Sequence, residues 1–556
     1  MRKALLFILL PVLIIRTDFL FAQISPVLST DTLRSINVIE GEVLSSRKVD
    51  SVTEIQTISR NVVLREGTTI FKCDSAIINK RLNTLEAFGN VRINQGDSVF
   101  TNSAYLKYLG SERIAYLKRN VKLTDRKSVL TTQDLEYNLS TGIGKYINGG
   151  KVVTNKTVLT SRQGIYYEDT KDIYFVNNVD VVDPKTKIKA DSLLYNAQTE
   201  IITFIGPTYI KNKDGDIFTT QGTYDLKNSN AYFGNRTLVK DSSGRVYQAN
   251  TMAFDEKSSQ AQLEGNAIIR DSANRFIVTG NQLFLNRKNN SFLATKKPVL
   301  VLWENKDTTY ITADTLFSGF TKKVFEDDST STIKVKVDTT DRIAVKKDSS
   351  SLRVDGKTEA VNSNKADSAI RYFLAYHHVR IFNDSLQAVC DSLFYSGADS
   401  VFRLFYDPVI WSGQNQLTGD TIFLYTKNKK AERVHVFESG IMINKINAEF
   451  YNQVEGKSIN AYFKAGVIDY IRVKGSPAES IYYVQDKDSA YTGMNRADAS
   501  VIDMFFIKEQ LDKVKFLNDL HGKLYPIRQI PQDRKYLKKF TWLDQRRPKN
   551  KLELFE

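Results

Sequence analysis

A repeat of about thirty residues is the strongest constraint on how this 556-residue chain folds. A small or turn-forming residue, usually Asn or Gly, stands just before an apolar segment many times over, as in SRNVVL around Asn61 and FGNVRI around Asn90. The anchor positions are Asn61, Asn90, Asn120, Gly150, Asn178, Pro207, Asn235, Asn266, Pro298, His378, Pro408 and Gly440. They are 28 to 32 residues apart, except for one gap of 80. Such a period is typical of proteins that stack one structural unit.

The apolar pattern within each repeat has a period of two, which predicts β-strands rather than helices. The third residue past every anchor is apolar, whereas residues between, such as Arg92 and Lys122, are mostly polar. Side chains two positions apart share one face of a strand, so we expect the apolar ones to line a common interior. The candidates for this interior are Val62, Leu64, Val91, Ile93, Val121, Leu123, Val153, Val179, Val181, Ile210, Leu238, Ile269, Val301, Ile381, Trp411 and Ile443.

A second signature within the repeats is an extended segment that ends on an aromatic residue. The clearest examples are Tyr108, Tyr137, Tyr167, Tyr195, Tyr224 and Phe254. Polar turns rich in Asn, Asp, Ser and Gly separate these segments. The predicted fold class is therefore all-β, an elongated repetitive β-jellyroll or β-solenoid of about 12 to 14 thirty-residue units. Such a sheet has two open ends, which proteins either cap or use to join partners edge to edge.

Five segments are predicted along the chain. They are 1–22, a signal peptide; 36–320, a β-repeat region; 321–370, a disordered polar insert; 371–525, a continued β-repeat region; and 526–556, a basic–aromatic tail. The signal peptide is predicted because a basic start precedes a twelve-residue apolar run, with Ala22 offering a cleavage site. Retention of this segment as an anchor stays open. The insert is predicted to be disordered because Asp, Lys, Ser and Thr crowd it.

The later part of the chain carries weaker signals. Two degenerate repeats are expected near Gly475 and Gly522, and residues 501–507 favour a strand over an amphipathic helix. The tail carries Tyr536, Phe540, Trp542 and Phe555 among basic residues. Either a docking segment or a terminus packed on the last repeats fits this composition.

The sequence offers little for catalysis or metal binding. Two cysteines, Cys73 and Cys390, and four histidines are too few for a disulfide framework or a metal module. No nucleophile elbow, phosphate-binding loop or metalloprotease motif occurs. His377 and His378 stand at an anchor, where a turn is expected. We therefore expect no catalytic residues, no metal and no cofactor. The net charge of +15 favours anionic partners, but the charges of the insert nearly cancel, so no nucleic acid is expected.

The segment from Ile55 to Tyr108 resembles the OstA/LptA-like family of periplasmic lipopolysaccharide-transport proteins. The matching features are the Asn-Val steps at Asn61 and Asn90, the Cys-Asp-Ser-Ala sequence from Cys73, and the thirty-residue period. The likeness is good to about Ile210 and weaker to Gly440. The ending Trp542…Arg546-Arg547-Pro548-Lys549 looks like that of long family members of the Bacteroidetes type.

The resemblance implies an open β-jellyroll that binds lipid A acyl chains inside and forms a bridge across the periplasm. It implies pairing end to end with inner-membrane and outer-membrane transport components of the same fold, and self-association in the same way. The chain is then a non-enzymatic periplasmic lipopolysaccharide-binding protein, associated with either membrane through partners. Two alternatives stay open at this point. One is a secreted structural or adhesive β-solenoid, and the other is a polysaccharide-acting β-helix enzyme.

Overall fold

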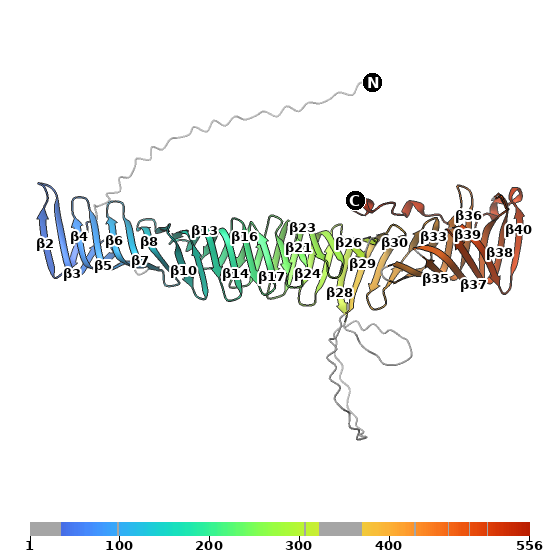
Figure 1. The fold of residues 1–556 in the computed structure, drawn as a ribbon, viewed down its shortest axis with the longest axis horizontal. Coiled ribbons are helices and arrows are strands. Elements are labelled where there is room, and N and C mark those ends of the chain that lie inside the picture. Colours follow the sequence, from blue (N-terminus) through green and yellow to red (C-terminus); the bar gives the residue numbers. More distant parts are fainter. Residues whose placement is uncertain are drawn as a thin grey trace, which may run out of the picture. The chain divides into compact units, whose positions relative to one another are not determined.

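The computed structural model describes residues 35–321 and 370–555, apart from 97–98, 305–306, 428–429, 465, 489 and 509. These residues form 40 β-strands and four short 3-10 helices (Figure 1). The predicted signal peptide, and all of the predicted insert except Thr321 and Ile370, lie outside the described residues. Within the part described, no helix is long and apolar enough to cross a membrane.

The chain divides into two units, which are described separately. One comprises Met1–Gly150 and Tyr166–Asp169, and the other Lys151–Ile165 and Thr170–Glu556. The strands of the first unit are β1 Asn37–Glu40, β2 Val43–Lys48, β3 Glu54–Glu66, β4 Thr69–Asn79, β5 Thr84–Gln95, β6 Val99–Leu109, β7 Ile114–Thr124, β8 Ser128–Asn138 and β9 Ile143–Tyr146. From β3 to β9, each strand pairs antiparallel with the next one along the chain.

The second unit contains most of the repeats. Its first strands are β10 Gly150–Thr154, β11 Thr157–Ser161, β12 Gln163–Tyr167, β13 Asp172–Val182, β14 Thr186–Asn196, β15 Ile201–Phe204, β16 Thr208–Asn212, β17 Gly215–Thr219, β18 Gly222–Asp225, β19 Asn230–Phe233, β20 Leu238–Asp241, β21 Val246–Gln248 and β22 Thr251–Asp255. The next are β23 Gln260–Asp271, β24 Phe276–Asn286, β25 Ser291–Thr295, β26 Val299–Glu304, β27 Asp307–Thr312, β28 Thr315–Thr321, β29 Ile370–Phe382, β30 Gln387–Ser396 and β31 Val401–Phe405.

The unit continues with β32 Val409–Ser412, β33 Asn415–Thr418, β34 Thr421–Lys427, β35 Lys430–Lys445, β36 Tyr451–Lys464, β37 Val467–Gln485, β38 Tyr491–Ile507, β39 Gln510–Leu517 and β40 His521–Pro526. The short helices are η1 Ile527–Gln529, η2 Gln532–Arg534, η3 Asp544–Arg546 and η4 Lys551–Leu554. The strand expected over residues 501–507 is confirmed as part of β38. The prediction of a repetitive all-β jellyroll is also confirmed.

Left-handed corners explain why Asn and Gly recur at the anchors. In β3, Arg60 and Asn61 have φ of 67° and 52°, a region that Gly and Asn adopt at the lowest cost. The strand bends here, because Ser59 pairs with Ser75 but Val62 already pairs with Cys73, which leaves one extra residue as a bulge. Further consecutive left-handed pairs are Gly89-Asn90, Arg119-Asn120, Asn177-Asn178, Asn235-Arg236, Gly265-Asn266, Lys296-Lys297, His377-His378, Tyr406-Asp407, Glu438-Ser439 and Asn518-Asp519.

Each corner divides a long strand into two arms that belong to two halves of a folded sheet. Burial alternates along both arms, as β5 shows with Leu85, Ala87, Val91 and Ile93 all at most 3% exposed. These side chains form the inner face between the two halves. The core of each unit is therefore a continuous apolar layer enclosed by its own strands.

The two histidines occupy a corner, as expected. Nδ1 of His378 lies 2.9 Å from Oδ2 of Asp314, and Nδ1 of His377 lies 3.1 Å from Oδ1 of Asp391. The hydrogen bond and charge of Asp314 raise the pKa of His378. These contacts hold the ends of the corner side chains and bind no metal in the described part of the chain, where no group of three or more His, Cys, Asp or Glu residues is placed to hold an ion.

Candidate functional site

Most of the predicted interior residues lie on the inner face. All are at most 3% exposed, and their cross-strand neighbours are also inward, as when Phe71 pairs with Ile93. The predicted residues found here are Val62, Leu64, Val91, Ile93, Val121, Leu123, Val179, Val181, Ile210, Ile269 and Ile381. In these repeats the residues one and three positions past the anchor point inward, as predicted from the sequence.

Three predicted residues point the other way, which corrects the expectation for them. Leu238 is 40% exposed, whereas its neighbour Val239 is buried. Val153 and Val301 are half-buried on the outer face, beside the inward Val152 and Leu300. The cause is the position of the corner. The last left-handed residue is Gly149, Arg236 or Lys297 rather than Gly150, Asn235 or Pro298, and a shift of one residue exchanges the two faces of a strand.

Trp411 and Ile443 are fully buried but lie on the outer face, which is a second correction. Their corners end at Asp407 and Ser439, so the inward side chains are those of Ile410 and Met442. Ile410 pairs with Leu417, and Leu417 pairs with Met442. Trp411 instead pairs with Gln416, which pairs with Ile443. The outer row is buried because another segment of the chain covers it.

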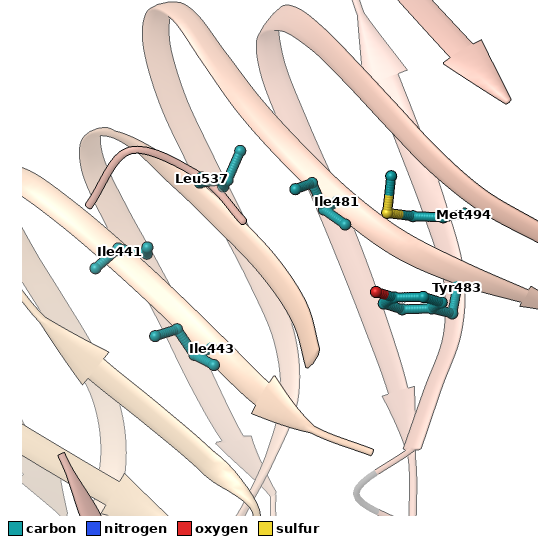
Figure 2. Close-up of a cluster of buried hydrophobic side chains, with 6 residues drawn as sticks. All are labelled: Ile441, Ile443, Ile481, Tyr483, Met494 and Leu537. Atoms are coloured by element: carbon teal, nitrogen blue, oxygen red, sulfur yellow. The ribbon is translucent and has the colours of Figure 1, made fainter. Parts of the chain in front are cut away.

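The covering segment is the C-terminal tail, residues 527–555, which returns from β40 across β38, β36, β33 and β30 (Figure 1). Leu537 of the tail packs with Ile441, Ile443, Ile481, Tyr483 and Met494 (Figure 2). Leu543 packs against the second cluster, formed by Val389, Val409 and Trp411. Of the two alternatives for the tail, packing on the last repeats is therefore realised.

Three buried glutamines in the outer row hold the tail. Nε2 of Gln453 donates to Lys535 O at 3.0 Å, while Leu537 N donates to Gln453 Oε1 at 2.8 Å. Gln416 makes the same two contacts with the tail residues six positions further along. Its Nε2 donates to Thr541 O at 2.8 Å, and Leu543 N donates to its Oε1 at 2.7 Å. After six more residues, Arg547 Nε donates to Gln387 Oε1 at 2.8 Å. The tail thus contains a six-residue repeat matched to the strands beneath it.

Tyrosines hold the two halves of the folded sheet together at one side of the interior. Leu85 pairs with Tyr108, Tyr108 with Ala115, and Ala115 with Tyr137, so these residues form one inner row. We call this row, and the row of corresponding residues in the second unit, the lip row. Tyr108 donates a hydrogen bond to Glu66 and Tyr166 donates one to Asp125 at 2.9 Å, each acceptor lying on the opposite half.

The lip tyrosines follow one another at intervals of 29 residues, at positions 108, 137, 166, 195 and 224. All five are buried. Burial and the carboxylate partners raise the pKa of Tyr108, Tyr137 and Tyr166, so their hydroxyls remain donors. The inward aromatic of its repeat is Tyr166 and not Tyr167, which is 37% exposed. Along these repeats buried side chains fill the inner face, and the tyrosine hydrogen bonds join the two halves of the sheet.

After Tyr224 the lip row carries residues without a hydroxyl, until Ser318 and Tyr395. In the second unit the row continues from Tyr224 through Ala231 and Phe254 to Ala261 and Leu285. A pocket of about 780 Å³ opens beside Phe254 and Leu285 in this part of the chain. Two further cavities, of about 390 Å³ and about 750 Å³, share lining residues. Phe276 and Arg371 line both of them. The cavities therefore lie along the part of the row where phenyl and alkyl side chains predominate, with Tyr224 lining the first cavity and Tyr395 the second.

The walls of the two cavities are apolar and their rims are charged. Phe233, Ile269 and Phe292 line the first cavity, and Phe373, Phe402 and Leu424 line the second. Several charged residues at or beside the rims form ion pairs. They form Arg245–Asp241 at 2.9 Å, Arg287–Asp214 at 3.2 Å, Arg275–Glu304 at 2.9 Å and Lys430–Asp307 at 3.1 Å. An apolar pocket with a few polar groups is the usual form of a ligand site.

Two features of this site were not found from the sequence. From the sequence, the aromatic residues were interpreted as the ends of strands. The change from tyrosine to phenylalanine at Phe254 was not connected with hydrogen bonds that close the interior. Arg371 gave no signal at all, since it stands at the margin of the polar segment and outside the anchor pattern. Alignment of the repeats by aromatic position would have revealed the first feature only.

The fold and the site define a repetitive all-β protein with an apolar layer between its strands and partly open cavities along it. Residues 34–191 match the family of OstA-like proteins, and residues 159–291 match the family of LptA and LptD N-terminal-domain lipopolysaccharide-transport proteins. Residues 34–291 are therefore similar to OstA/LptA-like lipopolysaccharide-transport proteins.

Comparison with solved structures gives LptH, the LptA-homologous periplasmic component of the lipopolysaccharide-transport device of Pseudomonas aeruginosa. The identity is 11%, over 19% of this chain and 84% of that one, with a TM-score of 0.18. No curated protein matches the chain.

Proposed function

We propose that the chain is a non-enzymatic periplasmic protein that binds lipopolysaccharide and carries it toward the outer membrane. The observation that carries this proposal is the pair of apolar cavities within the interior of the second unit. The family matches over residues 34–291 support it. Burial of acyl chains, at roughly 0.8 kcal/mol per CH₂ group, is the driving force.

The cavities favour this function over that of a secreted structural β-solenoid, for which we expect an interior filled throughout. The binding residues proposed are those on the inner face, with Val152, Val239 and Leu300 in place of Val153, Leu238 and Val301. Along the repeats that carry the lip tyrosines, acyl chains can pass only if the hydroxyl–carboxylate contacts separate. In the described strands between Phe233 and Leu424, no tyrosine–carboxylate contact joins the two halves, so we propose that these strands hold the lipid.

Pairing of end strands with partners is the second part of the proposal. In the first unit, β2 pairs with β3 along one edge, and in the second unit β40 pairs with β38 along one edge. Among the described residues, β3 is the pairing partner given for β2, and β38 the one given for β40. Leu44 and Leu524 are each 59% exposed on these strands. Such edges accept a further strand from a partner of the same fold or from a second copy.

Site-specific photo-crosslinking in cells tests the lipid-binding function. A photoreactive phenylalanine at Phe402, which lines the larger cavity, should form adducts with lipopolysaccharide. The matched control is Phe218, which is 50% exposed on the outer face. Equal labelling at the two positions would reject the internal site. The same probe at Leu44 or Leu524 should capture partner proteins, and capture no greater than at the exposed turn residue Leu82 would reject edge pairing.

A further inference from the structure

Arg371 and Phe276 are the two residues that line both cavities. Its guanidinium lies 5.1 Å from the centroid of the Phe276 ring and 4.3 Å from that of Phe320. Nη1 donates a hydrogen bond of 2.9 Å to Ser318 Oγ. The two rings and this hydrogen bond fix the plane of the guanidinium, which retains further N–H donors for a ligand.

Within the described residues, Arg371 forms no ion pair with a carboxylate, and the nearby carboxylates are engaged elsewhere. Asp241 accepts hydrogen bonds from Arg245 and Tyr247. Asp271, which is buried, accepts from the backbone and side-chain nitrogens of Asn274 at 2.9 and 2.8 Å. Arg371 is thus a half-buried cation whose charge is left for another anion.

The electrostatic surroundings agree with this arrangement. Burial, followed by the nearby charge of Arg245, lowers the pKa of Arg371 to about 10. The side chain is therefore still charged at neutral pH, although its environment disfavours the charge. A bound anion would remove this penalty, because an opposite charge at close range favours the charged form.

We infer that Arg371 binds a phosphate group of an acylated lipid whose acyl chains occupy the two flanking cavities. This inference rests on the proposed function and specifies the part of the lipid that is recognised. The planar fork of an arginine matches two phosphate oxygens at once. The cavities, of about 390 Å³ and about 750 Å³, lie on either side of the charge and are large enough for apolar groups of a ligand.

The test measures equilibrium binding of two lipids to the purified full chain. One is diphosphoryl lipid A, and the other is the same lipid A after removal of both phosphates. Unsubstituted protein should bind the phosphorylated lipid about tenfold or more tightly than the dephosphorylated one, as expected for a charge-assisted hydrogen-bonded pair. Arg371→Gln should abolish this preference and leave binding of the dephosphorylated lipid unchanged. Arg371→Lys should keep part of the preference.

The controls separate the possible failures. Arg270→Gln, at an exposed position on the outer face, should behave as the unsubstituted protein. A full preference for the phosphorylated lipid in Arg371→Gln would overturn the inference and leave the proposed function intact. Failure of the unsubstituted protein to bind either lipid would overturn both. A further arm adds inorganic phosphate to the binding measurement with diphosphoryl lipid A. Displacement of the lipid by an equal concentration of phosphate would show a site for free phosphate instead.

Discussion

The hydroxyl of Tyr166 donates a hydrogen bond of 2.9 Å to Oδ2 of Asp125, a residue 41 positions earlier in the chain. Neither residue can bury its polar group alone without a large loss of solvation. The contact therefore fastens the two halves of the folded sheet at the lip of the first unit. It also makes closure of the interior there dependent on a carboxylate.

Tyr166→Phe should destabilise the fold by about 1–3 kcal/mol, because Asp125 stays buried and loses a donor. The measurement is the denaturant midpoint at neutral pH. Tyr167→Phe is the matched control, since Tyr167 is 37% exposed, and it should change stability little. Equal effects of the two substitutions would contradict a fastening role for Tyr166.

The same contact predicts a dependence of stability on pH. Burial by itself would raise the pKa of Asp125, but hydrogen bonds from Ser128, Tyr166 and Lys127 outweigh it and lower the pKa. A carboxyl with a lowered folded-state pKa stabilises the fold above its unfolded pKa, near 4. This stabilisation is lost as the pH falls through the folded-state value. Acid titration of unfolding should show the loss in the unsubstituted protein and a smaller loss in Tyr166→Phe.

The left-handed corners predict that Asn120 cannot be replaced freely. Asn120 has φ of 54°, so Asn120→Ala should cost about 1 kcal/mol of unfolding free energy. Asn120→Gly should be close to neutral, since Gly adopts this conformation without strain. Thermal unfolding of both variants, beside Lys122→Ala on the exposed face of the same strand, checks this. Unchanged thermal stability of Asn120→Ala would contradict a requirement for Asn or Gly at this corner.

The glutamine contacts predict that one amide controls docking of the tail. Gln453→Met removes the partners of Lys535 O and Leu537 N, and each unpaired group costs about 1–3 kcal/mol. Amide hydrogen exchange across residues 531–543 should become faster in this variant. Gln532→Met is the control, because Gln532 is exposed. Unchanged exchange in Gln453→Met would mean that apolar packing of Leu537 alone holds the tail.

Both cysteines should be inert in the folded protein. Burial, as the largest cause, raises the pKa of Cys73 to about 11 and that of Cys390 to about 12. Because the thiolate is the reactive species, iodoacetamide at mildly alkaline pH should modify neither residue until denaturant is added. Mass spectrometry of peptides from folded and denatured samples gives the answer. Rapid modification of the folded chain would contradict the burial of these thiols.

The sequence alone was enough to predict much of the fold. The thirty-residue period and the apolar period of two are local properties, so they predicted an all-β repeat with an apolar inner face. At corners where Asn or Gly is the second left-handed residue, as at Asn61, Asn90 and Asn266, the inward residues followed correctly. The family resemblance over Ile55–Tyr108 was also carried by local motifs, and the family matches confirm it.

Tertiary structure decided the rest. Whether a corner ends at Asn235 or Arg236 depends on backbone torsion that a similar local sequence does not reveal, and this one residue exchanges Leu238 for Val239 at the inner face. Trp411 and Ile443 are buried by a tail more than ninety residues away, so no periodic pattern near them distinguishes inner from outer face. The charge of Arg371 and the cavities beside it depend on which side chains meet across the interior, and that is a property of the assembled strands alone.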